Sequence, residues 1–191
     1  PTGFIKLDDY TSGFQPGDLV IVAGRPGMGK TSFCLNVAQN MAITYGYSVG
    51  FFSLEMSKEQ LGYRLMCAEA EVDLQKMRAG FLSKEDYRHL AAATDKLSRA
   101  RIFIDDTAGV DIIEVRSKAR RLQKEHGLDA IMIDYLQLMR SHAKFENRNL
   151  ELADISRNLK ALSKELRIPV VALSQLSRQP ERRGKIGRAH V

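Results

Sequence analysis

Residues 24–31, with the sequence Gly-Arg-Pro-Gly-Met-Gly-Lys-Thr, fit the pattern G-x-x-x-x-G-K-S/T. The apolar run at 19–23 before them is rich in β-branched side chains, which is typical of a strand buried on both faces of a parallel sheet. After the pattern, Phe33, Val37 and Met41 recur at helical spacing. A strand, a glycine-rich loop and a helix in this order predict an α/β fold built around a phosphate-binding loop.

The residue types of this loop suit a bound anion. Its glycines let the backbone curl with the N–H groups inward, and the start of the next helix adds free N–H groups and a positive dipole end. Lys30 is placed to reach the outer phosphates of a nucleoside triphosphate, and the Thr31 hydroxyl to ligate Mg²⁺. We expect ATP or another nucleoside triphosphate to bind at Gly24, Arg25, Pro26, Gly27, Met28, Gly29, Lys30, Thr31 and Ser32.

Strand-like and helix-like segments alternate along the rest of the chain. Further apolar runs lie at 48–54, 101–105, 129–134 and 169–174. This alternation predicts a doubly wound, mainly parallel sheet flanked by helices.

The helices are indicated by caps and by apolar spacing. Between the second and third strands we expect two helices, one opened by the capping box at Ser57 and one by Ser83, with Gly80 between them. Residues 110–126 predict another helix. A last helix is indicated by the apolar stripe that begins at Leu152, whereas residues 140–148 lack apolar periodicity and predict a polar loop.

A phosphate loop needs a second carboxylate to hold Mg²⁺, commonly an aspartate at the end of a buried strand. Two segments of the chain satisfy this requirement. The run at 102–104 is followed by Asp105 and Asp106, and the run at 130–133 is followed by Asp134. Spacing alone separates them only weakly, because either strand is able to neighbour the strand that leads into the loop.

Two further polar residues end predicted strands. Glu55 follows the second strand and is a candidate base that polarises an attacking water, although its position just before the Ser57 cap is an equal explanation. Gln175 ends the last strand, where an amide is able to hydrogen-bond a terminal phosphate, although an ordinary loop residue is the more frequent explanation of a glutamine at a strand end. In open α/β sheets, ligands bind at the carboxyl ends of the strands, so both residues are expected near the loop.

Composition agrees with one globular domain, since the chain has 191 residues of which 44% are hydrophobic. The net charge is +6, and residues 175–191 alone contribute +4, so charge by itself is weak evidence for DNA binding. Cys34 and Cys67 lack metal-ligand spacing and are expected to be small buried hydrophobic residues. Without a bilayer-spanning stretch or a signal-peptide pattern, the expected location is the cytoplasm, with no membrane partner.

Five segments together resemble one family. They are Pro-Thr-Gly-Phe at 1–4, Ala-Gly-Arg-Pro-Gly-Met-Gly-Lys-Thr at 23–31, Ser-Leu-Glu-Met at 53–56, Ile-Asp-Tyr-Leu-Gln-Leu at 133–138 and Leu-Ser-Gln-Leu-Ser-Arg at 173–178. In order and spacing they resemble the RecA-like motor domain of bacterial replicative DNA helicases, the DnaB family, over residues 1–183.

The resemblance implies a homo-hexameric ring that encircles single-stranded DNA, moves along it by hydrolysing nucleotide, and works near the nucleoid with primase and a helicase loader. It implies that Asp134 is the Mg²⁺-associated acid, Glu55 the catalytic base and Gln175 a phosphate sensor, with Lys30 acting on the phosphates. Asp105 and Asp106 then have structural roles.

The chain also departs from the family pattern. The collar domain and the segment that carries the arginine finger are missing, and residues 184–191 do not resemble the family, so we expect a truncated RecA-like core at 1–183 with a disordered tail. Alone it should be mainly monomeric and only weakly active. Two alternatives remain, a recombinase or clock-type ATPase and a nucleotide-binding module without turnover; the sequence at 134–138 argues against the first and Glu55 against the second.

Overall fold

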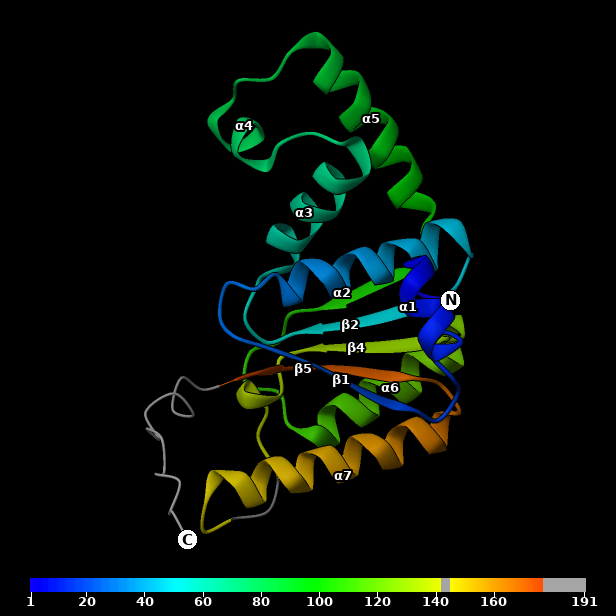
Figure 1. The fold of residues 1–191 in the computed structure, drawn as a ribbon, viewed down its shortest axis with the longest axis vertical. Coiled ribbons are helices and arrows are strands. Elements are labelled where there is room, and N and C mark those ends of the chain that lie inside the picture. Colours follow the sequence, from blue (N-terminus) through cyan, green and yellow to red (C-terminus); the bar gives the residue numbers. More distant parts are fainter. Residues whose placement is uncertain (142–144, 177–191) are drawn as a thin grey trace, which may run out of the picture.

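A five-stranded parallel sheet forms the centre of the computed structural model, which describes residues 1–141 and 145–176 (Figure 1). The tail at 184–191 and nearly all of the basic segment at 175–191 lie outside the described residues. The sheet order is β1-β5-β4-β2-β3. Its strands are β1 Leu19–Gly24, β2 Val49–Ser53, β3 Ile102–Asp105, β4 Ala130–Asp134 and β5 Val170–Gln175.

All five predicted strands are confirmed, with ends that differ by no more than one residue. Parallel pairing fixes their register, with Leu19 opposite Val170 and Ser53 opposite Asp134. All residues of β2 and β4 are buried, because helices cover both faces of the sheet. The parallel arrangement brings the carboxyl ends of all strands to one edge.

Helices cover both faces of the sheet (Figure 1). One face carries α2, whose residues pack on β2, β4 and β5, and the other face carries α6 and α7. The helical segments are α1 Ile5–Thr11, α2 Lys30–Gln39, a π-helical turn η1 Asn40–Thr44, α3 Lys58–Ala70, α4 Leu74–Ala79, α5 Lys84–Arg99, α6 Ile112–His126, a 3₁₀ turn η2 Leu136–Leu138 and α7 Arg148–Leu166.

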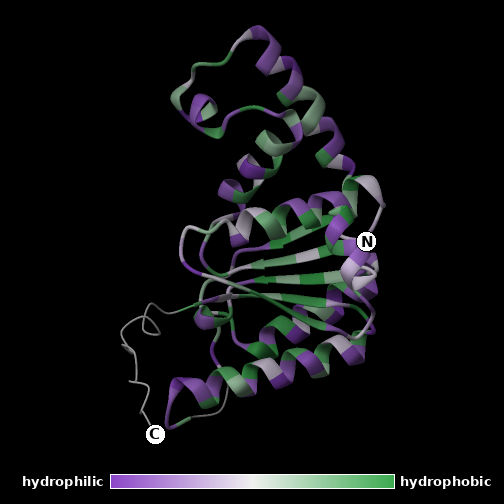
Figure 2. Cartoon of the chain, viewed as in Figure 1, coloured by the Kyte–Doolittle hydropathy of each residue, from purple (hydrophilic) through white to green (hydrophobic). Residues whose placement is uncertain are grey.

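The side chains of successive β4 residues point to opposite faces of the sheet, as they do in any β-strand. Ile131 and Ile133 pack with α6 and α7, whereas Ala130 and Met132 pack with α2. Figure 2 shows the result, with hydrophobic residues concentrated in the strands and hydrophilic residues along the outer sides of the helices. Two cores, one on each face, therefore hold the sheet rigid.

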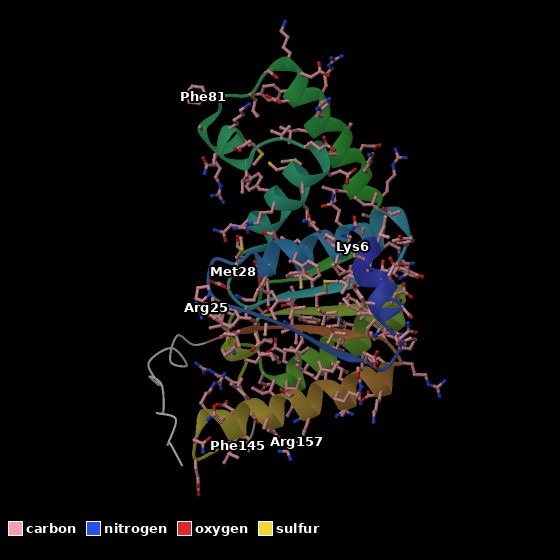
Figure 3. The ribbon with its side chains drawn as sticks, viewed as in Figure 1. Lys6, Arg25, Met28, Phe81, Phe145 and Arg157 are labelled. Atoms are coloured by element: carbon pink, nitrogen blue, oxygen red, sulfur yellow. The ribbon has the colours of Figure 1, made fainter. Side chains whose placement is uncertain are left out.

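The segment between β2 and β3 contains three helices, one more than expected, and projects from the sheet (Figure 1). Both predicted capping boxes are present, at Ser57 and Ser83, and Gly80 ends the additional helix α4. This segment has a small core of its own, formed by Cys67, Ala70, Val72, Leu90 and Ala93. Phe81 lies exposed at its outer part (Figure 3).

The start of one helix and the presence of another were not predicted correctly. Helix α7 begins at Arg148, so the predicted polar loop at 140–148 is too long. The Asn147 side chain accepts a hydrogen bond from the Leu150 N–H, and this cap starts the helix one turn before the apolar stripe. Helix α1 was not expected at all, because none of its residues is buried and it has no apolar face to detect.

The Pro-Thr-Gly-Phe segment at 1–4 packs against η1. Gly3 has a φ of 83°, and a Cβ atom on it would lie 2.3 Å from the Asn40 side-chain nitrogen, so only glycine fits there. The buried Thr2 donates its backbone N–H to Asp8 at 2.8 Å. The segment is thus a fixed part of the domain.

Both cysteines are buried, as expected, and burial raises the pKa of the Cys34 thiol to about 12, with the Asp134 charge contributing. Across the described residues, no helix combines the length and the apolar character that a bilayer crossing requires.

Candidate functional site

The loop between β1 and α2 exposes backbone donors at the start of a helix. Gly27 and Gly29 have φ values of 76° and 80°, a left-handed conformation that glycine adopts without strain. No side chain caps α2 at Gly29, so the first N–H groups of the helix lack a side-chain acceptor. Together with the helix dipole, these groups form an anion-binding position.

Asp134 lies at the end of β4 and faces this loop. Its residue exposure is only 1%, and its Oδ2 accepts a hydrogen bond of 2.6 Å from the Thr31 hydroxyl. Burial raises the pKa of Asp134, and the negative charge of Glu55 adds to this, whereas the Thr31 bond and the charges of Lys30 and Arg64 oppose it. A buried carboxylate in this setting is stabilised by a cation.

A hollow of about 660 Å³ connects these groups at the carboxyl edge of the sheet. Glu55 follows β2 there, and Gln175 ends β5. The hollow is lined by Pro26, Gly27, Gly29, Lys30, Thr31, Ser32, Glu55, Met56, Gln60, Arg64, Arg78, Asp134, Tyr135 and Gln175.

The structure therefore brings the predicted site residues together. Gly24, Arg25 and Met28 complete the loop around the hollow, and Figure 3 shows Arg25 and Met28 at the end of the sheet away from α1. The Lys30 ammonium donates to the Arg25 carbonyl at 3.0 Å, so it is held within the loop.

The competing acids lie elsewhere, because β3 is the strand farthest from β1 in the sheet. Asp105 pairs with Lys118 at 2.8 Å, and Asp106 accepts the backbone N–H of Lys58 at 2.9 Å at the start of α3. Both make structural contacts and neither lines the hollow.

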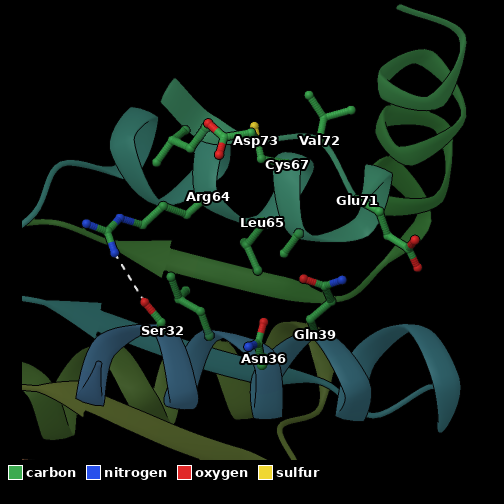
Figure 4. Close-up of a pocket in the computed structure, with 12 residues that line it drawn as sticks. Ser32, Asn36, Gln39, Arg64, Leu65, Cys67, Glu71, Val72 and Asp73 are labelled. Atoms are coloured by element: carbon green, nitrogen blue, oxygen red, sulfur yellow. Dashed lines mark hydrogen bonds between the residues drawn. The ribbon is translucent and has the colours of Figure 1, made fainter. Parts of the chain in front are cut away.

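Sequence reasoning missed the cationic side chains that the helical segment adds. Arg64 from α3 and Arg78 from α4 line the hollow, and Arg64 donates to the Ser32 hydroxyl at 3.3 Å (Figure 4). A second hollow of about 450 Å³ lies between α2 and α3 beside this contact (Figure 4). No motif marks these arginines, since their placement depends on how α3 and α4 pack.

The donor set fits Mg²⁺. The Thr31 hydroxyl and the Asp134 carboxylate are hard oxygen ligands, and they lie 2.6 Å apart. Among the described residues no group of three or more histidine, cysteine or acidic side chains is clustered for metal binding. Mg²⁺ commonly takes one or two protein oxygen ligands and completes its shell with water and phosphate.

Known proteins have sequences similar to that of this chain. The replicative DNA helicase DnaB of Geobacillus stearothermophilus is 52% identical over 184 residues, which are 96% of this chain and 40% of the relative. The replicative DNA helicase DnaC of Bacillus subtilis is 51% identical with the same coverage. The chain thus spans about 40% of the length of these relatives.

Solved structures share the fold. A DnaB-like replicative helicase, described with its interactions with primase, has a TM-score of 0.90 at 38% identity, covering 97% of this chain and 45% of that one. A second solved structure, described as an ATPase domain, has a TM-score of 0.89 at 38% identity, covering 96% of this chain and 66% of that one. Residues 1–187 match the family described as the DnaB-like helicase C-terminal domain, and the chain belongs to that family.

Proposed function

We propose that the chain is the ATP-hydrolysing motor of a hexameric replicative DNA helicase, which unwinds duplex DNA while moving along single-stranded DNA. The observation that carries this proposal is the 2.6 Å bond between Thr31 and Asp134, on a hollow that Glu55 and Gln175 also line. A nucleotide site with a candidate base supports ATP hydrolysis. The replicative DNA helicases among the relatives support the coupling of that hydrolysis to DNA unwinding.

Binding rests on the loop and on the two oxygen ligands. The backbone N–H groups at the start of α2 and the Lys30 ammonium hold the phosphates. The Thr31 hydroxyl and the Asp134 carboxylate would hold Mg²⁺, which would supply positive charge next to the phosphates.

Hydrolysis needs a group that orients water and a group that contacts the terminal phosphate. Glu55 accepts a proton from the attacking water as general base. The uncharged Gln175 side chain donates a hydrogen bond to the terminal phosphate and thereby senses whether it is present. The position of β5 between β1 and β4 in the sheet supports this role, because the end of β5 then lies between the loop and Asp134.

Assembly and partners follow from the family. We propose a homo-hexamer in the cytoplasm, at the nucleoid, with single-stranded DNA in its ring and with primase and a helicase loader as partners. A related structure is described with its interactions with primase, which supports that partner. A nucleotide-binding module without turnover remains the second candidate, and Glu55 on the hollow argues against it.

The test is Lys30→Ala, with Lys58→Ala as the control because Lys58 is an exposed lysine at the start of α3, outside the lining of the hollow. Binding of a fluorescent nucleotide should be lost in Lys30→Ala and kept in the control, with unchanged thermal unfolding. An assembled hexamer that contains this motor sequence unchanged, the parent, should hydrolyse ATP faster when single-stranded DNA is added. Parent-like nucleotide affinity in Lys30→Ala would refute the site, and absence of turnover by the parent would leave only the binding module.

A further inference from the structure

The main-chain pairing between β4 and β5 stops before the site. The last paired residues are Ile133 and Ala172, whereas Asp134 and Gln175 lie beyond this ladder. On its other side, Gln175 is paired with Gly24, the first residue of the phosphate loop. Near the hollow, β5 is therefore held by main-chain pairing to the loop strand but not to the strand that carries Asp134.

The side chain of Gln137 fills this gap. Its Oε1 accepts the backbone N–H of Gln175 at 3.1 Å, and its Nε2 donates to the Gln175 carbonyl at 3.1 Å and to the Ser174 hydroxyl at 3.0 Å. One amide thus makes the pair of bonds that a neighbouring strand would make. Gln137 lies three residues after Asp134, in the turn η2 that follows β4.

The turn that carries Gln137 is itself held. The Arg148 guanidinium, at the first position of α7, donates to the carbonyls of Gln137 at 2.9 Å and Met139 at 2.8 Å. Met139 is fully buried in the core under α7. The Gln137 side chain consequently projects from a fixed support, and its bonds to Gln175 define where the end of β5 lies.

We propose that Gln137 is a positioning residue, which keeps the Gln175 side chain at the terminal phosphate in register with Asp134 and Thr31. This inference rests on the proposed role of Gln175 as the group that contacts the phosphate. Gln137 does not line the hollow and acts through its bonds to the Gln175 backbone and the Ser174 hydroxyl. Removing its amide should therefore slow turnover without weakening nucleotide binding.

The test compares Gln137→Leu, Gln175→Ala and the double variant in an assembled hexamer that contains this motor sequence. We expect Gln137→Leu to lower kcat about 10- to 100-fold, the range for a misplaced group, with nucleotide Kd within about twofold of the parent. Because both residues act at one point, the double variant should be about as slow as Gln175→Ala alone. Gln15→Leu is the control, since its amide also donates to a main-chain carbonyl, that of Ser12 at 2.7 Å, outside the hollow.

Two further measurements separate positioning from general stability. In the chain itself, hydrogen exchange of the Gln175 amide should quicken in Gln137→Leu, while exchange within β4 stays unchanged. Gln137→Glu keeps the acceptor for the Gln175 N–H but sets a carboxylate oxygen against the Gln175 carbonyl, so its kcat should also fall below that of the parent; it carries the test if Gln137→Leu does not fold.

Three results would overturn the inference: parent-like kcat in both Gln137 variants, a double variant slower by the product of the single effects, or weaker nucleotide binding with unchanged kcat. A parent hexamer that does not hydrolyse ATP would refute the proposed function instead. In that case the exchange measurement still decides whether Gln137 fixes the end of β5.

Discussion

Replacing Glu55 by glutamine removes the proposed base from the hollow while keeping the shape of the side chain. Glu55 follows β2 by two residues, and Ser53 of that strand pairs in register with Asp134. Glu55 and Asp134 both line the hollow, and the negative charge of Glu55 contributes to the raised pKa of Asp134.

The expected loss follows from the role of a general base, which typically contributes ~10²–10⁴ in rate. At about 1.4 kcal/mol for each factor of ten, this raises the barrier by about 3–5 kcal/mol. Binding should respond differently. The amide carries no charge that repels phosphate, so nucleotide affinity should be unchanged or slightly tighter. The variant should therefore bind and fail to turn over.

The assay measures single-turnover hydrolysis and fluorescent-nucleotide binding in the assembled hexamer. Glu59→Gln is the matched control, because Glu59 is an exposed carboxylate in the first turn of α3 and does not line the hollow. The control should hydrolyse ATP like the parent. A Glu55→Gln hexamer that hydrolyses ATP at the parent rate would refute the assignment of the base.

Two predictions concern the fold. Burial raises the pKa of Asp105, but the hydrogen bonds from Lys118 and Thr107 outweigh it and leave the pKa below its ordinary value. The stability that these bonds give is present above the unfolded pKa of about 3.9 and is lost as pH falls through the folded pKa. In urea unfolding, the free energy of unfolding of the parent should therefore fall more on acidification than that of Asp105→Asn. Leu159→Ala should lower the free energy of unfolding by about 2–5 kcal/mol, because Leu159 is fully buried, and the more exposed Leu150→Ala by less than about 0.5 kcal/mol; equal losses would contradict the assigned core.

The strands were predictable because each is a short apolar run. The expectation that the strand at 19–23 is buried on both faces was wrong, because β1 is an edge strand of the sheet and Ile21 is exposed. Periodicity also located α6 almost completely, since residues 110–126 contain the observed Ile112–His126. It failed for α1, which has no buried residue, and for the first turn of α7, which the Asn147 cap starts before the apolar stripe. Apolar spacing therefore reports burial, and an unburied helical turn gives no such signal.

The phosphate loop was predictable from its residues alone, but the choice of the Mg²⁺ acid was not. Asp105 and Asp134 both end apolar strands, and only the resemblance to a family favoured Asp134. The geometry explains why spacing fails. Asp105 is paired with Lys118, and Asp134 with Thr31, through contacts between segments far apart in sequence.

The order of the strands in the sheet determines how far the polar residue after each strand lies from the phosphate loop. With β5 between β1 and β4, the end of β5 necessarily lies between the phosphate loop and the Asp134 carboxylate. Glu55 follows β2, the next strand beyond β4, and Asp105 ends β3, one strand further away, where the Lys118 ammonium pairs with it. Main-chain pairing between β4 and β5 stops at Ile133 and Ala172, and beyond it the Gln137 side chain bonds to the backbone N–H and carbonyl of Gln175.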